Sequence, residues 1–526
     1  MLGKEAIVSF LVNKQIGHIF HLPGIHSLPL CQSFVKHGVK TVMGRHESAV
    51  AFAAIGYAQA TGRLGVLVVT PGPGLGNIVS ACLEAHGDQV PLLVIHIDTE
   101  RNEIGKGVLH ELPDPERIFT HFTRGAFVVE QKESLLPALD DAYYAALSAR
   151  PGPALVSVPY ALLEKEVLPS PVIGERAVAK EPDLTGLDDA LSGKERPVIV
   201  GGGLLMTEEL GLSLETLCRE SAIPFLATSA GKGVLSEDRL EAFGCIVKKG
   251  VVRTILESAD VVIAIGTRLR DVETKRRGVK IKELIHFDVD DTWIGRNYPT
   301  KLGIAGNLKT SLNGLCRIMK GRKSSWRLEE LKALQQKEEI NFLRNAPGFR
   351  IINLLRDVTP DDAVSVWDLN LIFYWAEYYF PVLRQKTFLN GGGSSTLFYA
   401  VPASIGAKVG RPDRPCLCVA GDGGALPMLG ELAFVRQNNI PVVFLVYNNN
   451  SFGVLEHYMK QRYALEGSMS LTNPDFIQLA RAFDIPAKRA KNLDSLRDVF
   501  VRHVRWDEPF LIEFQYPGFL PPWEVQ

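Results

Sequence analysis

Short apolar runs recur along the whole chain, and each is followed by glycine or by a polar turn. The runs are rich in valine, leucine and isoleucine and show no regular alternation with polar residues, as expected of strands buried on both faces of a parallel sheet. Amphipathic stretches that fit helices separate them. The pattern therefore predicts an α/β fold. The runs are LGVLVVT, PLLVIHI, RPVIVGGG, ADVVIAIG, LIHFDVD, CLCVAGDG and IPVVFLVYNNN.

Two segments break this pattern and are candidate linkers. Residues 168–186 are rich in proline and charge, and residues 320–341 are charged with a helical pattern. At 526 residues the chain is too long for one hydrophobic core, and its length favours about three domains. We expect doubly wound parallel-sheet domains at residues 1–165, 180–325 and 345–526.

The charge balance excludes several classes of partner. The net charge is −1 and no block of lysine or arginine occurs, so neither a nucleic acid nor a membrane surface is expected as partner. Polar residues interrupt the first twenty positions, which argues against a signal or membrane segment and favours a cytoplasmic protein. The seven cysteines are scattered without metal-ligand spacing. Cys416 and Cys418 alternate in a strand-like run, as buried reduced thiols do.

A glycine-rich turn follows one of the buried runs. Gly421, Asp422, Gly423 and Gly424 come directly after CLCVA and before a helical pattern. Glycines at such a turn let backbone N–H groups point at an anion such as phosphate. Taken alone, this signal has low specificity.

A second polar turn follows the next buried run. It contains Asn449 and Ser451, and one strand–helix–strand unit fits between it and Asp422. The two turns should therefore lie side by side at the carboxyl ends of neighbouring strands, where open parallel sheets bind ligands. A carboxylate, an amide oxygen and a backbone carbonyl are ligands that suit Mg²⁺. We expect a magnesium and phosphate site at this edge.

The pairing of GDGG with NNNSFG at this spacing resembles the diphosphate and metal motif of thiamine-diphosphate-dependent enzymes. The resemblance extends over essentially the whole chain and is greatest to the acetohydroxyacid synthase, benzoylformate decarboxylase and benzaldehyde lyase branch. GVLSED, VVIAIGTRLRD and IHFDVDDTWIGRN resemble the central domain of acetohydroxyacid synthases. The resemblance implies a pyrimidine-binding, a central and a diphosphate-binding domain, with the cofactor between two subunits of a homodimer or homotetramer.

The resemblance also implies roles for individual residues. Asp422, Asn449 and the carbonyl of Ser451 match the metal ligands. Leu397 matches the bulky residue that holds the cofactor bent, and the Ser395 carbonyl matches the group that faces the cofactor amine. Pro23 and Asn77 occupy positions that line the pyrimidine pocket.

Glu47 has two interpretations. It heads the apolar stripe Val50, Ala51, Ala54 and Ile55 of a predicted helix. As a first-turn acid it would only favour the positive end of the helix dipole. In the resembling family, a glutamate at the matching position contacts a pyrimidine ring nitrogen and promotes the reactive tautomer, which requires a carboxylate in a dry pocket. The presence of both the GDGG and the NNNSFG motif favours this catalytic role.

The chain departs from the family at several positions. His26 matches a histidine of benzaldehyde lyase that faces the reactive carbon, and His110 stands where acetohydroxyacid synthases have glutamine; a structural role is open for each. The usual diphosphate turn is altered to contain Asp368 and Asn370, which puts a cofactor contact of Asn370 in doubt. Tyr458 replaces the tryptophan of the substrate channel.

The glycine triplet at 201–203 offers a weak signal for FAD, which stays open as an alternative cofactor.

Three functions are compatible with these residues. The first is decarboxylation of a 2-oxo acid, with or without ligation to a second carbonyl compound, and GKGVLHELPD resembles decarboxylases of this kind, including one for a guanidino 2-oxo acid. The second is an acetolactate synthase-like transferase, and the third a benzaldehyde lyase-like hydroxyketone lyase, which would take an aldehyde as partner substrate. A catalytically silent relative is disfavoured because Glu47 and the metal positions are present.

Overall fold

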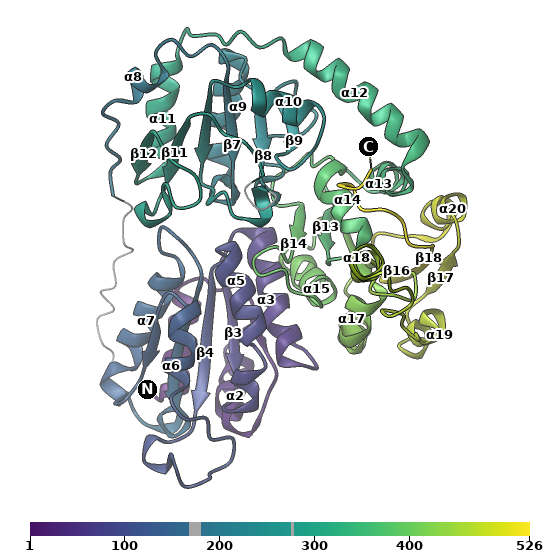
Figure 1. The fold of residues 1–526 in the computed structure, drawn as a ribbon. Helices are drawn as coiled ribbons and strands as arrows, with labels where there is room; N and C mark the ends of the chain where they lie inside the picture. Colours follow the sequence, from purple (N-terminus) through teal and green to yellow (C-terminus); the bar gives the residue numbers. More distant parts are fainter. Residues whose placement is uncertain (168–179, 275–277, 526) are drawn as a thin grey trace.

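A computed structural model describes residues 1–167, 180–274 and 278–525. Within them lie three six-stranded sheets whose neighbouring strands all run parallel, with helices packed on both faces (Figure 1). Each sheet occupies one of the three predicted ranges. The predicted α/β class with three doubly wound parallel sheets is therefore confirmed.

The N-terminal sheet has the strand order β2-β1-β3-β4-β6-β5. Its strands are β1 Ile19–His21, β2 Thr41–Met43, β3 Gly65–Val69, β4 Leu92–Asp98, β5 Ala126–Val128 and β6 Pro153–Pro159. Its helices are α1 Gly3–Asn13, α2 Leu28–Lys36, α3 Glu47–Thr61, α4 Pro73–Gly76, α5 Val79–Asp88, α6 Pro115–Phe119 and α7 Leu135–Ala146. Successive residues of β3 contribute to hydrophobic clusters on opposite faces, which explains why its sequence is apolar throughout.

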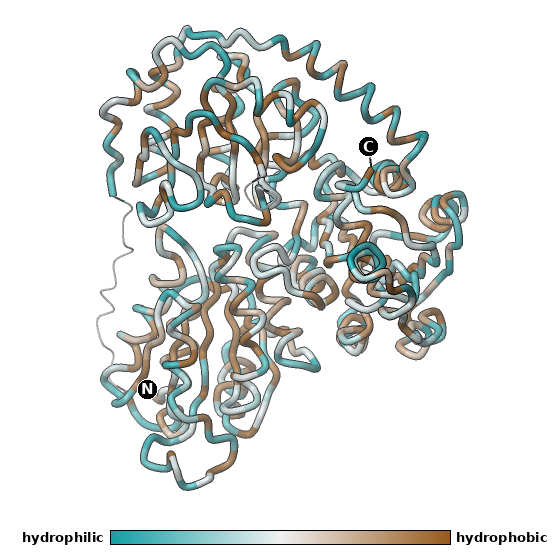
Figure 2. Tube along the Cα trace, in the orientation of Figure 1, coloured by the Kyte–Doolittle hydropathy of each residue, from teal (hydrophilic) through white to brown (hydrophobic). Residues whose placement is uncertain are grey.

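The central sheet has the order β12-β11-β10-β7-β8-β9. Its strands are β7 Pro197–Gly201, β8 Phe225–Ala227, β9 Ala242–Cys245, β10 Val261–Ile265, β11 Leu284–Asp288 and β12 Leu302–Ala305. Its helices are α8 Leu187–Leu191, α9 Glu208–Ser221, α10 Val251–Ser258 and α11 Leu308–Met319. The charged helix α12, Leu328–Asn345, follows and leads to the C-terminal domain (Figure 2).

The C-terminal sheet has the order β14-β13-β15-β16-β18-β17. Its strands are β13 Val364–Trp367, β14 Phe388–Asn390, β15 Cys416–Gly421, β16 Val443–Asn448, β17 Ala487–Ala490 and β18 Phe510–Gln515. Its helices are α13 Pro347–Val358, α14 Leu371–Tyr379, α15 Ala400–Gly410, α16 Asp422–Ala425, α17 Leu432–Asn438, α18 Gly453–Tyr463, α19 Phe476–Ala482 and α20 Leu493–His503. Cys416 and Cys418 are buried in β15 as expected.

Helices α3 and α15 join the first and last domains in one hydrophobic core. Their backbones touch at two glycines. A Cβ atom at Gly56 would lie 2.0 Å from the carbonyl oxygen of Ala403, and one at Gly406 would lie 1.7 Å from that of Ala53. Only glycine allows so close a crossing.

Arg270 lies where all three domains meet. From the central domain, its guanidinium group donates to the Gly393 carbonyl of the C-terminal domain at 3.1 Å. It also contacts Asp88 of α5 at 3.4 Å and Glu273 at 3.1 Å. Burial, and then the neighbouring Glu84, raise the pKa of Asp88. One partly buried cation thus connects the three domains.

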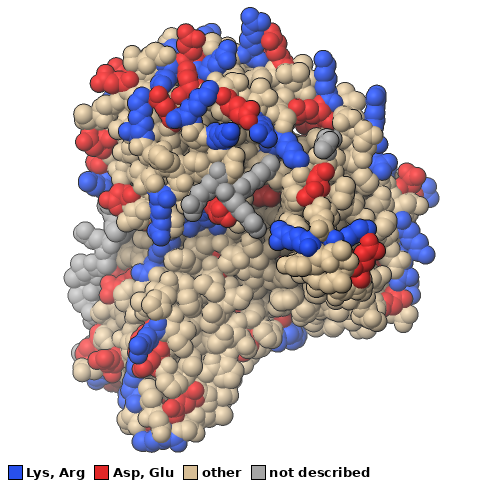
Figure 3. All heavy atoms as spheres, in the orientation of Figure 1, with Lys and Arg blue, Asp and Glu red and all other residues tan. Residues whose placement is uncertain are grey.

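The domain limits 1–165, 180–325 and 345–526 remain proposals. Residues 168–179 of the first expected linker lie outside the described residues. Within the second, Leu328 and Leu331 of α12 pack into the central core. Basic and acidic side chains are intermixed on the face drawn in Figure 3, and no helix in the described part of the chain is long and apolar enough to cross a membrane.

Candidate active site

The C-terminal sheet brings three polar turns to one edge. They follow β13, β15 and β16, and β15 pairs in parallel with both of the others. The chain reverses its direction of strand addition between β13 and β15, and open α/β sheets bind ligands at such a point. The expected neighbourhood of the Asp422 and Asn449 turns is therefore observed.

A cavity of about 200 Å³ opens at this edge. Most of the C-terminal residues singled out from the sequence line it: Asn370, Leu397, Gly421, Asp422, Gly423, Gly424, Asn449 and Ser451. A Cβ atom at Gly423 would lie 2.5 Å from the ring of Phe452, so a larger residue is excluded there. The cavity thus combines a glycine turn with oxygen-bearing side chains.

Asp422 is buried at the start of α16, and burial raises the pKa of its carboxyl group. Asn473, which the sequence reasoning missed, donates its amide to Asp422 Oδ2 at 2.7 Å. The same amide nitrogen lies 3.1 Å from Asn448 Oδ1 and 3.2 Å from Asn450 Oδ1. A single N–H donor group therefore sits among three oxygen acceptors. No motif marks Asn473, because it lies in a loop beyond α18.

Asn370 has a local structural task. Its side-chain oxygen accepts from the Phe373 N–H at 3.0 Å and caps α14, while its amide donates to the Asp368 carbonyl at 2.8 Å. Burial raises the pKa of the neighbouring Asp368 to about 7. Both groups of the Asn370 amide are thus engaged within its own turn, although the residue lines the cavity.

The segment before α15 is held by the N-terminal domain. Glu84 of α5 accepts from the Gly393 N–H at 2.5 Å and from the Ser394 N–H at 3.0 Å. Ser395 follows with a left-handed φ of 58°, and Leu397 reaches the cavity. Ser395 itself lines a second, larger cavity beside the first. Glu84 was missed because its partners lie in another domain.

Glu47 begins α3, which follows β2 at the edge of the N-terminal sheet. His46 caps the helix, and Asn77 donates its amide to Glu47 Oε2 at 3.0 Å. The Ser48 hydroxyl donates to the Asn77 carbonyl at 2.5 Å. The glutamate is half-buried, while the stripe behind it is fully buried. Glu47 and Asn77 are therefore in direct contact at the start of α3.

Two histidines lie near this pair. The rings of His26 and His110 have centroids 5.6 Å apart, and the ring of Tyr160 lies 5.4 Å from that of His26. His110 adopts a left-handed φ of 63°, and a Cβ atom at Gly72 would lie 2.7 Å from its carbonyl oxygen. Burial, and then His110, lower the pKa of His26, which favours its neutral form.

The two groups of residues do not form one site within a single chain. All residues that line the smaller cavity belong to the C-terminal domain. Pro23 is exposed and lines a different groove, together with Phe434 and Gln437. The loop before Glu47 instead docks on its own C-terminal domain, where the Arg45 N–H donates to Glu431 at 2.8 Å. The Glu47 cluster and the Asp422 cavity are therefore separate within one chain.

Comparison with known proteins assigns all three domains to one family. A model of thiamine pyrophosphate enzymes matches residues 1–118 as their N-terminal TPP binding domain and residues 372–514 as their C-terminal TPP binding domain. Residues 185–315 match their central domain. The chain belongs to the thiamine pyrophosphate enzymes. Thiamine pyrophosphate is thiamine diphosphate under another name, so the predicted family and cofactor are confirmed.

Comparison with similar proteins indicates to which branch of the family this enzyme belongs. A probable 2-ketoarginine decarboxylase of Pseudomonas aeruginosa is 30% identical over 94% of this chain and 90% of its own. A probable acetolactate synthase large subunit of Methanococcus aeolicus is 28% identical over 98% and 92%. Acetolactate synthase 1 of Nicotiana tabacum is 28% identical over 98% and 82%. The enzyme therefore lies in the decarboxylase and carboligase branch.

The glycine triplet of the enzyme's central domain has a packing role. A Cβ atom at Gly202 would lie 2.2 Å from the Gly266 carbonyl oxygen, and one at Gly201 would lie 2.5 Å from the ring of Phe225. These close contacts lie within the domain itself, so they explain the need for glycine at both positions without invoking a bound dinucleotide. They supply no support for FAD.

Proposed function

We propose that this enzyme decarboxylates a 2-oxo acid with thiamine diphosphate and Mg²⁺ held between two copies of the chain. One observation carries the proposal: the cavity around Asp422 and the cluster around Glu47 are complementary halves, one suited to diphosphate and metal, the other to an aminopyrimidine. Neither half is complete alone. The similarity to decarboxylases and acetolactate synthases supports the same chemistry.

The residues around Asp422 fit a hard cation. We assign Asp422, Asn449 and the Ser451 carbonyl as its ligands, because all three residues line the cavity and such oxygen groups suit Mg²⁺. Asn473 already places a positively polarised N–H group among oxygen acceptors there. The buried Ser451 hydroxyl has no hydrogen-bond partner among the described residues. Both observations support a ligand at this position.

The chain's own groups would hold the cofactor in its reactive geometry. When bound, thiamine diphosphate supplies a nucleophilic carbon and a cationic ring that accepts the electrons released with CO₂. Glu47, oriented by Asn77, would share a proton with a pyrimidine nitrogen through a charge-assisted hydrogen bond. Leu397 would support the bent cofactor, and the Ser395 carbonyl would accept a hydrogen bond from the amine.

The products formed from 2-oxo acids test the proposed function. The loaded enzyme is incubated with pyruvate, benzoylformate and longer 2-oxo acids, and aldehydes are separated from hydroxyketones. Aldehyde release supports decarboxylation. Condensation of two 2-oxo acids would instead identify a synthase, cleavage of a supplied hydroxyketone would identify a lyase, and tight cofactor binding without any turnover would identify a silent relative.

The active assembly is expected to be a homodimer or a homotetramer. Exposed apolar side chains lie beside both groups of residues. Ile25, Leu109 and Tyr160 lie next to His26 and His110, Leu455 lines the Asp422 cavity, and Tyr463 and Leu465 follow at and beyond the end of α18. Apolar surface of this kind favours association. Light scattering at assay concentration should report at least twice the mass of one chain, and a monomer that retains full activity would contradict the shared site.

The two histidines should influence the later steps of the reaction. We expect His26→Ala and His110→Ala to change turnover or the ratio of products while cofactor affinity stays nearly constant, because both lie away from the diphosphate cavity. Cofactor titration and product analysis separate these effects. His121→Ala, at an exposed position, serves as the control. Wild-type rates and products in both variants would assign His26 and His110 to structural roles.

A further inference from the structure

A second cavity, of about 590 Å³, lies between the central and C-terminal domains. It shares the wall residues Leu369 and Tyr374 with the diphosphate cavity and includes Ser395. It therefore adjoins the place assigned to the cofactor. Its volume is that of a typical small-molecule pocket and leaves room for a 2-oxo acid with a long side chain. Tyr458 of α18 also lines it.

The charges on the cavity wall are predominantly negative. Four carboxylate residues and two guanidinium residues line it: Asp271, Glu273, Glu377, Glu524, Arg270 and Arg462. Arg270 is held by Glu273 and Asp88, and the guanidinium carbon of Arg462 lies 4.7 Å from the centre of the Tyr458 ring. Both cations thus have partners on the protein.

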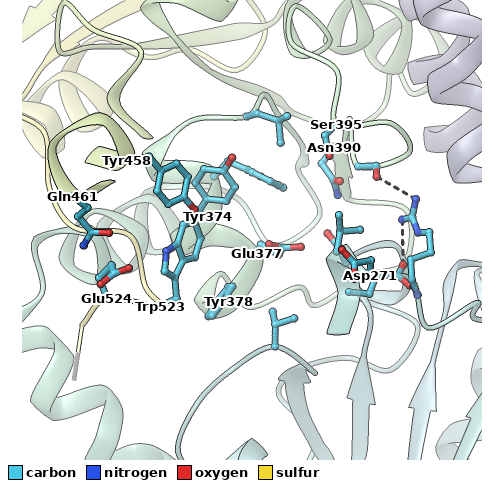
Figure 4. Close-up of a pocket in the computed structure, with 18 of the residues that line it drawn as sticks. Asp271, Tyr374, Glu377, Tyr378, Asn390, Ser395, Tyr458, Gln461, Trp523 and Glu524 are labelled. Carbon is cyan, nitrogen blue, oxygen red and sulfur yellow. Dashed lines mark hydrogen bonds and ion pairs between the residues drawn. The ribbon is translucent and has the colours of Figure 1, made fainter. Parts of the chain in front are cut away.

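Glu377 stands apart from the other acids. Its carboxylate projects from α14 into the middle of the cavity, between the aromatic rings on one side and Asp271, Asn390 and Ser395 on the other (Figure 4). The positive charge of Lys232 lowers the pKa of Glu377, but its ammonium group forms an ion pair with the Glu237 carboxylate at 2.6 Å. No ion pair to Glu377 is formed among the described residues. An enclosed carboxylate without a cation is costly, because burial disfavours its charged form.

Aromatic rings flank this carboxylate. Tyr374 and Tyr378 come from the same helix, and Trp523 contacts Tyr374 edge-on with ring centroids 5.0 Å apart. Aromatic faces attract cations, and flat guanidinium groups stack on them. A carboxylate beside aromatic walls is therefore a suitable receptor for an organic cation.

We infer that this cavity takes the far end of the 2-oxo acid substrate, and that this end carries a guanidinium or ammonium group bound by Glu377. The inference rests on the proposed function and names its substrate class. Glu377 pairs with the cation, the aromatic residues cover it, and the 2-oxo group points towards the diphosphate cavity. The positive charge of the substrate replaces the missing protein cation.

A matched pair of substrates tests the inference. Two 2-oxo acids of equal chain length, one ending in guanidinium and one in a neutral alkyl group, are compared with the loaded wild-type enzyme by CO₂ release. A preference for the cation is expected in kcat/KM. Glu377→Gln should reduce that preference by about 10- to 100-fold, as expected for the loss of a charge-assisted hydrogen bond. Equal or better use of the neutral acid by the wild type would overturn the inference.

Glu338→Gln is the matched control. Glu338 of α12 is also a partly buried glutamate whose pKa is raised by burial, but it accepts from the Val251 N–H at 2.9 Å, away from the cavity. The preference for the cation should persist in this variant. An equal loss in Glu338→Gln would contradict a specific role of Glu377.

Binding measurements separate the inference from the proposed function. The corresponding 2-hydroxy acids cannot lose CO₂ in the same way, and calorimetry measures their binding to the loaded protein. Tighter binding of the cationic analogue, lost in Glu377→Gln, supports the inference even if no 2-oxo acid is turned over, which would refute only the decarboxylase assignment. Equal binding of both analogues by the wild type contradicts the inference.

The pH dependence gives an independent readout. Burial raises the pKa of Glu377 to about 7, so the carboxylate needed for cation binding forms as pH rises through 7. With the cationic acid, kcat/KM should rise over that range relative to the neutral acid, and Glu377→Gln should abolish the difference. The same rise in the variant would exclude Glu377 as its source. The titratable and charged groups that face Glu377 are Lys232, Cys245, Arg270, Asp271, Glu273, Tyr374 and Tyr378.

Discussion

Replacing Glu47 by glutamine should leave a folded enzyme that binds thiamine diphosphate but hardly turns over. The amide keeps the size of the side chain and can still bond to Asn77, while the charge that stabilises the reactive tautomer is lost. A positioned acid or base contributes about 10²–10⁴ in rate, so turnover should fall by roughly that factor. Hydrogen–deuterium exchange at the thiazolium carbon, followed by quenched NMR, should fall in parallel.

Glu208→Gln is the control for this experiment. Glu208 is also the first residue of a helix, α9, and is exposed. A first-turn acid contributes only about 0.3–1 kcal/mol to stability through the helix dipole. The control should therefore lose little stability and no exchange activity. An unchanged exchange rate in a cofactor-loaded Glu47→Gln enzyme would show that Glu47 is such a residue as well.

Asp422→Ala should abolish retention of thiamine diphosphate. Without the bridging cation, the diphosphate has no partner for its negative charge, and loss of a direct ligand should weaken cofactor binding by more than about 100-fold, the upper range for residues that only support a ligand. Calorimetric titration with cofactor and Mg²⁺ measures the loss. Circular dichroism should show an intact fold.

Asp288→Ala provides the comparison. Asp288 is likewise a buried carboxyl at the carboxyl end of a strand, β11, and burial raises its pKa to about 6. Its removal deletes a similar group far from the proposed metal and should leave cofactor binding in place. If Asp422→Ala in excess EDTA binds thiamine diphosphate as tightly as the wild type binds it with Mg²⁺, the metal assignment is wrong.

The parts predictable from the sequence are those fixed by short stretches of chain. Unbroken apolar runs predict parallel strands because such strands are buried on both faces, as β3 shows. Asp422 and Asn449 could be paired because successive strands β15 and β16 are neighbours, so that chain order determines spatial order. The contact between Glu47 and Asn77 does not follow from strand order in this way, because β1 lies between β2 and β3, the strands that precede these two residues.

Residues whose partners lie far away in the chain could not be found in this way. Glu84 reaches a loop about 310 positions away in the chain, and no local pattern encodes such a contact. Asn473 lies in a loop without a motif, and its three oxygen partners become neighbours only when the sheet forms. Glu377 resembles any polar residue on an amphipathic helix until the central domain closes over it.

The junction at Arg270 limits how far the three domains can be treated as separate modules. Each has its own sheet, yet Asp88 and Glu84 of the first domain are buried against groups supplied by the other two. An isolated N-terminal domain would expose these acids, together with the apolar surface of α3, to water. The three domains, each with its own sheet, are thus not independent folding units. Exchanging one domain for that of a relative would require the junction residues to be exchanged with it.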